Sequence, residues 1–170
     1  MLKVIFIFIF FINYSLNAYE SEDKLKVVIV GKVAKYVEYQ NEISDNFTIT
    51  ILKNRFGTLF DDIYRDKKIK SKPVKILYID NIDQLSLTNI LYIPKVNSQE
   101  LSKIFEQTHN KNILTISDMR GFAQKGGVMQ LYFVSQKIKI KINTNSASRQ
   151  NLKIKSTLLR ISDVVKEDKP

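Results

Sequence analysis

ILTISDMRGFAQKGGVMQLYFVSQKIKIKIN, residues 113–143, is the stretch that decides the fold. Residues 113–116 form a short apolar run that is typical of a buried strand. Residues 128–134 and 137–143 predict two further strands, joined at 135–136. In the second of these, isoleucine at 138, 140 and 142 alternates with lysine at 137, 139 and 141. This period of two predicts a strand with one face in a core and the other in water.

The loop between the first two of these strands holds Gly121, Gly126 and Gly127, three of the five glycines in the chain. A structural interpretation is that glycine supplies a positive φ or allows the close approach of another chain segment. A functional interpretation is a ligand or partner loop, because open α/β sheets place their sites at the carboxyl ends of strands. The structural interpretation is favoured, since glycine loops mark turns more often than sites. The candidates for a partner- or ligand-binding site are Ser117, Asp118, Met119, Arg120, Gly121, Phe122, Lys125, Gly126 and Gly127.

The rest of the chain alternates between helical and extended patterns. Residues 21–39, 58–64, 98–108, 145–151 and 155–165 predict helices, although the β-branched residues within 27–30 leave a strand open there. Strands are predicted near 47–52, 74–79 and 90–93, a short helix or turn at 81–87, and a solvated basic connector at 67–72. These patterns predict an α/β fold, a single layered domain with a central mixed sheet of about six strands and helices on both faces.

The N-terminus has the pattern of a secretory signal peptide. Lys3 precedes nine apolar residues, 4–12, and a small residue, Ala18, ends the polar segment that follows. A membrane span needs roughly 20 apolar residues, so the run is too short to be one. Cleavage after Ala18 is expected, which divides the chain into a signal peptide (1–18), one α/β domain (19–165) and a charged tail (166–170), with no membrane span left after cleavage.

Composition excludes several classes of function. The chain has no Cys, which excludes thiolate metal sites and thiol catalysis. Its net charge of +10 comes from lysines spread along the whole sequence, whereas nucleic-acid binding needs a clustered basic patch, so no nucleic-acid partner is expected.

Residues that carry catalysis in other proteins are isolated here. His109 is the only histidine and has no partner cluster in the sequence, so neither a metal site nor a His-based catalytic site is predicted. Gly121 and Gly126 have the spacing of a phosphate-binding loop. Phosphate binding by such a loop needs Lys and Ser/Thr at the next two positions, which are Gly127 and Val128 here, so no phosphate-binding loop is predicted. Asp61 and Asp62 are adjacent on a helix and point apart.

The order of motifs resembles the YfiR family. The run 114–118 (LTISD), the pairs Gly121-Phe122 and Gly126-Gly127, and the residues that follow them have the family's order and spacing. The family opens with a helix that ends in an aromatic pattern, here KYVEY at 35–39, with Tyr39 where the family has Trp and Gln40 where it has Pro. The residues that match structural positions of the family motif are Tyr36, Tyr39, Gly57, Asn143, Ala147, Leu152, Leu158 and Leu159.

The resemblance implies a periplasmic protein that is not an enzyme and has no cofactor. Its implied partner is the periplasmic part of an inner-membrane signalling protein, either a diguanylate cyclase or a sensor kinase. The protein would bind and repress this partner. The sequence does not decide between a monomer and a homodimer. In the loop, Met119 and Phe122 are anchor-type residues and Arg120, Gln124 and Lys125 are a polar rim, although Phe122 could instead fill the domain's own core. The alternative function is a small-molecule-binding sensory or solute-binding subunit of the periplasm.

Overall fold

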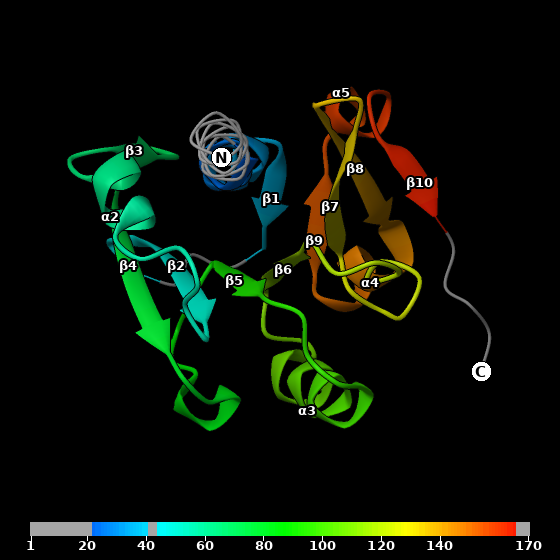
Figure 1. Cartoon of the computed structure of the whole chain (residues 1–170), viewed down its shortest axis with the longest axis horizontal. Coiled ribbons are helices and arrows are strands. Elements are labelled where there is room, and N and C mark those ends of the chain that lie inside the picture. The colour runs from blue at the N-terminus through cyan, green and yellow to red at the C-terminus, as the bar shows by residue number, and fades with distance from the viewer. Residues whose placement is uncertain (1–21, 41–43, 166–170) are drawn as a thin grey trace, which may run out of the picture.

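Eight strands form one curled mixed sheet in the computed structural model, which describes residues 22–40 and 44–165 (Figure 1). The predicted signal peptide and the charged tail lie outside the described residues. A helix over residues 22–34 precedes the following elements: β1 (Val37–Tyr39), β2 (Phe47–Leu52), α2 (Leu59–Tyr64), β3 (Lys68–Ile69), β4 (Lys72–Ile79), the 3-10 helix η1 (Ile82–Gln84), β5 (Ile90–Ile93), α3 (Ser98–Thr108), β6 (Leu114–Ser117), β7 (Met129–Val134), β8 (Lys137–Asn143), α4 (Thr144–Arg149), β9 (Leu152–Ile154), α5 (Ser156–Leu159) and β10 (Asp163–Val165).

The strand order of the large sheet is β10-β8-β7-β6-β5-β2-β4-β3. Strands β4, β2, β5, β6 and β7 run parallel, β8 is antiparallel to β7, and β10 is parallel to β8. From β2 the chain goes first to β4 on one side and then to β5 on the other side. The carboxyl ends of β2 and β5 are therefore a topological switch point, the place where open α/β sheets bind ligands.

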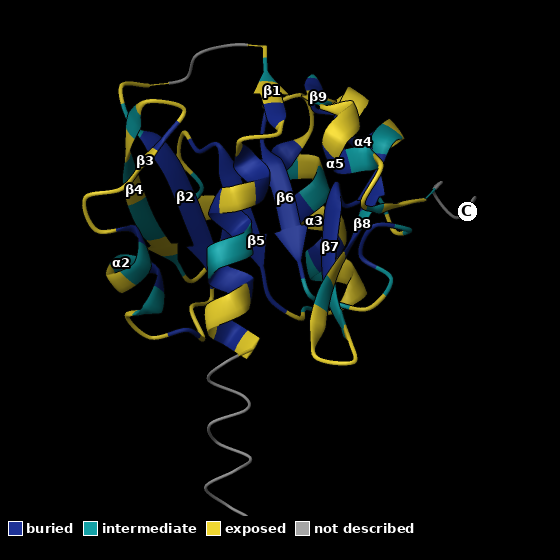
Figure 2. Ribbon diagram, turned by 90° about the horizontal axis from the view of Figure 1, so that it is seen from above, coloured by how far each residue is buried: buried dark blue, intermediate teal, exposed yellow. Residues whose placement is uncertain are grey.

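The sheet has a hydrophobic core on each face. In β5, Ile90 and Tyr92 point into the core that contains the first helix and α2, while Leu91 and Ile93 point into the core that contains α3. This alternation is the period of two of a strand that is buried on both faces. Figure 2 shows the first helix in front of the sheet and α3 behind it, so the predicted α/β class with helices on both faces is confirmed.

The number of strands differs from the prediction, since the sheet has eight rather than about six. The first extra strand, β3, lies in the segment 67–72 that was predicted to be a solvated connector, and it forms a hairpin with the start of β4. The second, β10, pairs with β8 and extends the sheet at its other edge. Both strands are two or three residues long, too short for a periodicity to reveal.

Two predicted helices are wrong in part, and in both the chain pairs as a strand instead. The helix predicted over 21–39 is helical in the described residues only to 34, and Val37–Tyr39 pairs with Leu152–Ile154 as a separate two-stranded sheet. Residues 155–165 were predicted as helical, but only Ser156–Leu159 is a helix before β10 begins. In both places distant strands supply hydrogen-bond partners, and this tertiary pairing overrides a weak local pattern.

Candidate functional site

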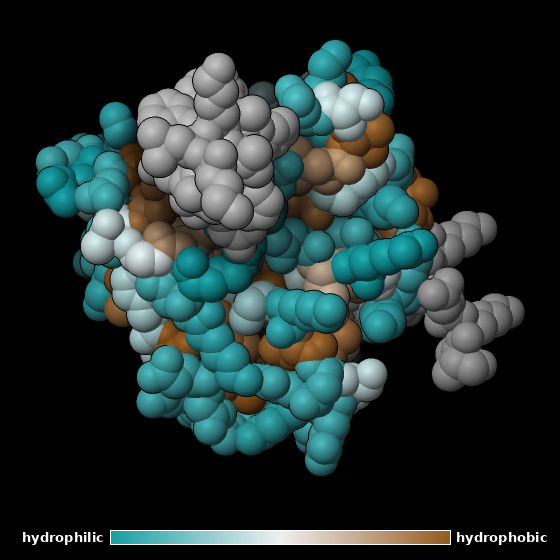
Figure 3. All heavy atoms as spheres, viewed as in Figure 1, coloured by the Kyte–Doolittle hydropathy of each residue, from teal (hydrophilic) through white to brown (hydrophobic). Residues whose placement is uncertain are grey.

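A hollow of about 640 Å³ lies at the carboxyl ends of β2, β5 and β6, where the topological switch occurs. Figure 3 looks onto this end of the molecule and shows hydrophilic side chains beside exposed hydrophobic ones. The volume of the hollow is within the range of roughly 300–1,000 Å³ that is usual for small-molecule sites. The residues that line it are Lys26, Arg55, Pro94, Lys95, Val96, Asp118, Met119, Arg120 and Lys125.

One wall of the hollow is a ring of four alternating charges. The carboxylate of Asp118 lies 2.8 Å from Lys26 Nζ and 2.7 Å from Arg55 Nη2. Asp23 closes the ring, at 3.3 Å from Lys26 and 3.1 Å from Arg55. The side chains of Lys26 and Asp23 are only 9% and 8% exposed. The ring therefore joins the first helix, the loop after β2 and the loop after β6 at one point.

The charges of the ring shift the pKa of Asp118 and of the neighbouring Tyr92. Burial raises the pKa of Asp118, but the hydrogen bond and charge of Lys26, with the charge of Arg55, outweigh burial and hold the pKa below its ordinary value. Burial, with the charge of Asp118, raises the pKa of the Tyr92 hydroxyl, which faces Arg55 and Asp118 without the geometry of a full hydrogen bond. At neutral pH Asp118 is charged and Tyr92 is protonated.

Three other cations of the hollow, Lys95, Arg120 and Lys125, form no ion pair with a carboxylate of residues 22–40 or 44–165. All three are exposed. Because the two carboxylates of the ring balance Lys26 and Arg55, these three leave the hollow with an excess of positive charge. The apolar side chains of Val96 and Met119 also line the hollow.

The predicted glycine loop is a folded unit that forms one side of the hollow. Ser117, at the end of β6, is buried, and its hydroxyl accepts a hydrogen bond from the Met119 N–H at 3.0 Å. The N–H of Lys125 donates to the carbonyl of Gly121 at 3.0 Å, which closes the loop on itself. Gly121 and Gly126 have φ angles of 78° and 108°, so both glycines provide the predicted left-handed conformation.

Phe122 and Gly127 belong to the core of the domain rather than to the surface. Phe122 is fully buried in the core of α3 and lies 5.8 Å from Phe105, centroid to centroid. A Cβ atom at Gly127 would lie 2.1 Å from the Phe122 ring, so a glycine is required there for close approach. The structure therefore favours the alternative in which Phe122 fills the domain's own core.

Asn143 connects the glycine loop to the end of the sheet. Its side-chain amide donates to the carbonyl of Ala123 at 2.8 Å, and its Oδ1 accepts from the Ser146 N–H at 2.9 Å, which caps α4. Asn143 is completely buried, so both bonds are sheltered from water. This residue of the family motif thus holds the loop and a helix in place at once.

The other residues of the family motif are mostly structural as well. Tyr39 packs edge-on against Phe47 with centroids 5.8 Å apart and pairs with Leu152 between β1 and β9. Gly57 has a φ of 57°, which favours glycine. Tyr36 is 41% exposed. Ala147, Leu152, Leu158 and, at its edge, Leu159 belong to the larger core.

The structure brings Asp118, Met119, Arg120 and Lys125 together on the hollow, while Ser117, Gly121, Gly126 and Gly127 shape the loop. Sequence reasoning missed the residues that come from elsewhere: Lys26, Arg55, Pro94, Lys95 and Val96. A signal was present, because Arg55 and Pro94 closely follow predicted strands, which the structure shows to be parallel. Carboxyl ends of parallel strands meet at one edge of a sheet, but the strand order that makes these neighbours is not readable from local patterns.

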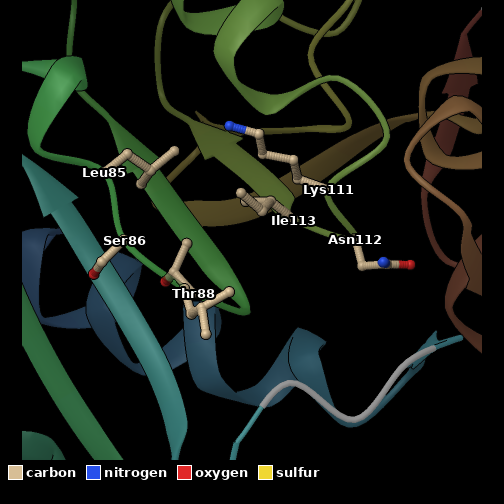
Figure 4. A pocket seen from close by; sticks show the side chains of 7 residues that line it. Leu85, Ser86, Thr88, Lys111, Asn112 and Ile113 are labelled. Atoms are coloured by element: carbon tan, nitrogen blue, oxygen red, sulfur yellow. The ribbon is translucent and has the colours of Figure 1, made fainter.

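A second hollow, of about 460 Å³, lies at the amino ends of β5 and β6 (Figure 4). Leu85, Thr88 and Ile113 line it, and in the figure Asn112 points away from Leu85 and Thr88. Lys111 is the one charged residue of its lining. With so few convergent polar groups, this hollow is a weaker candidate for a specific site.

Within residues 22–40 and 44–165, no three His, Cys, Asp or Glu residues lie close enough together to hold a metal ion. His109 caps the end of α3 and is exposed, away from the hollow. None of the described helices has the length and apolar character needed to span a bilayer.

The fold and the hollow define an α/β domain with a hollow of basic character at the strand ends. The family model described as YfiR/HmsC-like (DUF4154) matches residues 23–163, and the chain belongs to that family. At the level of the family, this membership supports a periplasmic regulator of a diguanylate cyclase rather than an enzyme.

No curated protein matches this chain. A solved structure, of an ABC domain in complex with L-Trp from Streptococcus pneumonia, is 10% identical with a TM-score of 0.49. The match covers 70% of this chain and 55% of that one, so the chain spans about half the length of that structure. Likeness at this level carries no argument about function.

Proposed function

We propose that this protein is a periplasmic regulator that binds the periplasmic part of an inner-membrane signalling protein, a diguanylate cyclase or a sensor kinase, and represses it. The observation that carries the proposal is the family match, which extends over nearly the whole described chain. Repression needs binding and no chemistry, which agrees with the isolated position of His109 and with the balanced charges of Asp23, Asp118, Lys26 and Arg55. The candidate partner surface on the glycine loop consists of the exposed residues Arg120 and Lys125 and the half-buried Met119, and other exposed faces are alternatives to it.

Deletion of the gene tests the proposal. We expect cyclic-di-GMP output, or the output of a membrane sensor encoded beside the gene, to rise in the deletion strain and to return with a plasmid copy. A pull-down from detergent-solubilised membranes should recover the signalling protein. If deletion changes no such output and the purified protein turns over a substrate, the protein is an enzyme and the proposal is wrong.

A second candidate function is a small-molecule-binding sensory subunit. It is favoured by one specific observation, the hollow of about 640 Å³ at the topological switch point. The two functions are compatible, because a ligand that binds one state of a regulator more tightly shifts its equilibrium toward that state. Size-exclusion chromatography with light scattering would determine whether the protein is also a homodimer.

A further inference from the structure

We propose that the hollow at the carboxyl ends of β2, β5 and β6 binds a small molecule with at least two negative charges, such as a phosphate ester or a polycarboxylate, through Lys95, Arg120 and Lys125. This inference rests on the second of the proposed functions, and it does not need the first.

The first argument is the charge balance of the hollow. Five cationic side chains line the hollow. Within the described chain, only the two carboxylates of the ring, Asp118 and Asp23, form ion pairs with any of them. The ring uses Lys26 and Arg55, whereas Lys95, Arg120 and Lys125 form no ion pair with any carboxylate of residues 22–40 or 44–165. Like charges in one concave site repel each other, and an anion between them relieves that repulsion.

The second argument is that the cations come from a rigid frame. Arg120 and Lys125 lie on the glycine loop, which is fixed at its start by the bonds of Asp118 to Lys26 and Arg55. It is fixed in its middle by buried Phe122 and by the bond from Asn143 to the Ala123 carbonyl. Because the backbone that carries Arg120 and Lys125 is already ordered, binding has to order only their side chains.

The third argument concerns the kind of anion. Arginine presents parallel N–H groups that match the two oxygens of a phosphate or a carboxylate, and lysine adds a point charge. The hollow is much larger than one phosphate group needs, and Val96 and Met119 give it an apolar wall. Its occupant is therefore an organic anion with an apolar or neutral part, and not a bare inorganic ion.

The charge ring has a supporting role in this site. A buried ring of four charges gives little net stability, because desolvation of the ions offsets their attraction. It does fix the positions of the first helix and of the loops that carry Arg55 and Asp118. The ring thus holds the walls of the hollow, while the anion itself is bound by cations outside the ring.

The test is a titration of the purified chain, labelled with ¹⁵N, at constant ionic strength. The probes are glycerol 3-phosphate, tricarballylate as a polycarboxylate, glycerol as the neutral analogue, and a poly-glutamate peptide. We expect at least one of the two small anions to bind and to shift the amide signals of residues 95–96 and 118–125, with no effect of glycerol. The two anion arms distinguish phosphate from carboxylate ligands.

The variant Arg120→Gln/Lys125→Gln removes two cations from exposed positions, so its melting temperature should stay unchanged. We expect its affinity for the anion to fall about tenfold or more, which corresponds to roughly 1.4 kcal/mol. The matched control is Lys137→Gln/Lys139→Gln on β8, which changes the net charge equally at exposed positions away from the hollow and should leave the affinity within about twofold.

The proposal is wrong if neither small anion binds at millimolar concentration, or if the control pair weakens binding as much as the test pair does. It is also wrong if only the poly-glutamate peptide binds, since the hollow is then a protein-docking surface. Equal binding of glycerol and glycerol 3-phosphate would overturn the anion proposal and leave the small-molecule function standing. None of these outcomes affects the deletion experiment.

Discussion

Gly127 lies against the ring of Phe122, and this contact explains why position 127 of the glycine loop is a glycine. A side chain at 127 would occupy the space of a fully buried ring, which cannot move away without opening the core around α3. We predict that Gly127→Val lowers the free energy of unfolding by about 1–3 kcal/mol, the usual cost of overpacking. Urea denaturation measures it, and in a Phe122→Leu background the same substitution should cost less. An equal cost in both backgrounds would contradict the contact.

Phe122 itself should behave as a core residue. Its ring packs with Phe105 and with the apolar face of α3, so Phe122→Ala leaves a cavity there. We predict a loss of about 3–5 kcal/mol in unfolding free energy. The control Val134→Ala, at a position that is 48% exposed, should change stability by less than about 0.5 kcal/mol. A stable Phe122→Ala variant with weakened partner binding would instead make Phe122 an interface anchor.

Asp118 makes the stability of the protein depend on pH. Its pKa lies below that of the unfolded chain, so its contribution is present above about pH 4 and is lost as the pH falls through the lower folded value. We predict that Asp118→Asn costs about 2 kcal/mol at pH 7, the scale of a charged hydrogen bond, and that the difference between the two proteins shrinks as the pH falls below about 4. Denaturation at a series of pH values measures this.

The control is Asp83→Asn. Asp83 pairs with Lys103 at 2.6 Å, but both side chains are about half exposed, so its loss should cost less than about 1 kcal/mol. A constant difference between Asp118→Asn and the natural protein at all pH values would show that Asp118 does not titrate as the ring requires.

At the scale of elements, Tyr64 of α2 is inserted into the first helix. Its hydroxyl accepts a hydrogen bond from the Gly31 N–H at 2.7 Å and donates to the Val27 carbonyl at 2.6 Å. Residues 27 and 31 are the two partners that an uninterrupted helix would bond directly. Gly31 is required because a Cβ there would lie 2.4 Å from the hydroxyl. The contact connects α2 to the first helix by a specific polar bond inside the core.

We predict that Tyr64→Phe lowers the free energy of unfolding by about 1–3 kcal/mol, because two buried backbone groups lose their partner. Tyr78→Phe is the matched control, since its hydroxyl bonds Asp61 on the exposed surface, and its cost should be below about 1 kcal/mol. Chemical denaturation measures both variants. Equal stability of Tyr64→Phe and the natural protein would mean that the helix closes its own bond without cost.

At the scale of the whole molecule, the prediction that remains is export. The signal-peptide pattern in residues 1–18 predicts cleavage after Ala18 and a mature chain that begins at Tyr19. We expect osmotic-shock extraction to release the protein, and N-terminal sequencing to begin at Tyr19 or within a few residues of it. Intact Met1 on cytosolic material would contradict export, and with it a periplasmic partner.

The sequence by itself determined the class of fold, the six inner strands of the large sheet and the position of the glycine loop. These features depend on local chemistry: the period-two alternation of lysine and isoleucine in β8, the apolar runs of β5 and β6, and the positive φ angles of Gly121 and Gly126. Family membership was also readable, because motif spacing is a property of the chain.

Only the tertiary structure decided which strand ends are neighbours. Arg55 and Asp118 are 63 residues apart in sequence and form a bond of 2.7 Å because β5 alone separates β2 from β6 in the sheet. For the same reason the strands β1 and β10 replaced predicted helices, since their hydrogen-bond partners lie far along the chain. Local patterns report which face of a segment is apolar, but strand order is fixed by packing between distant segments, and the hollow exists only where that packing brings their ends together.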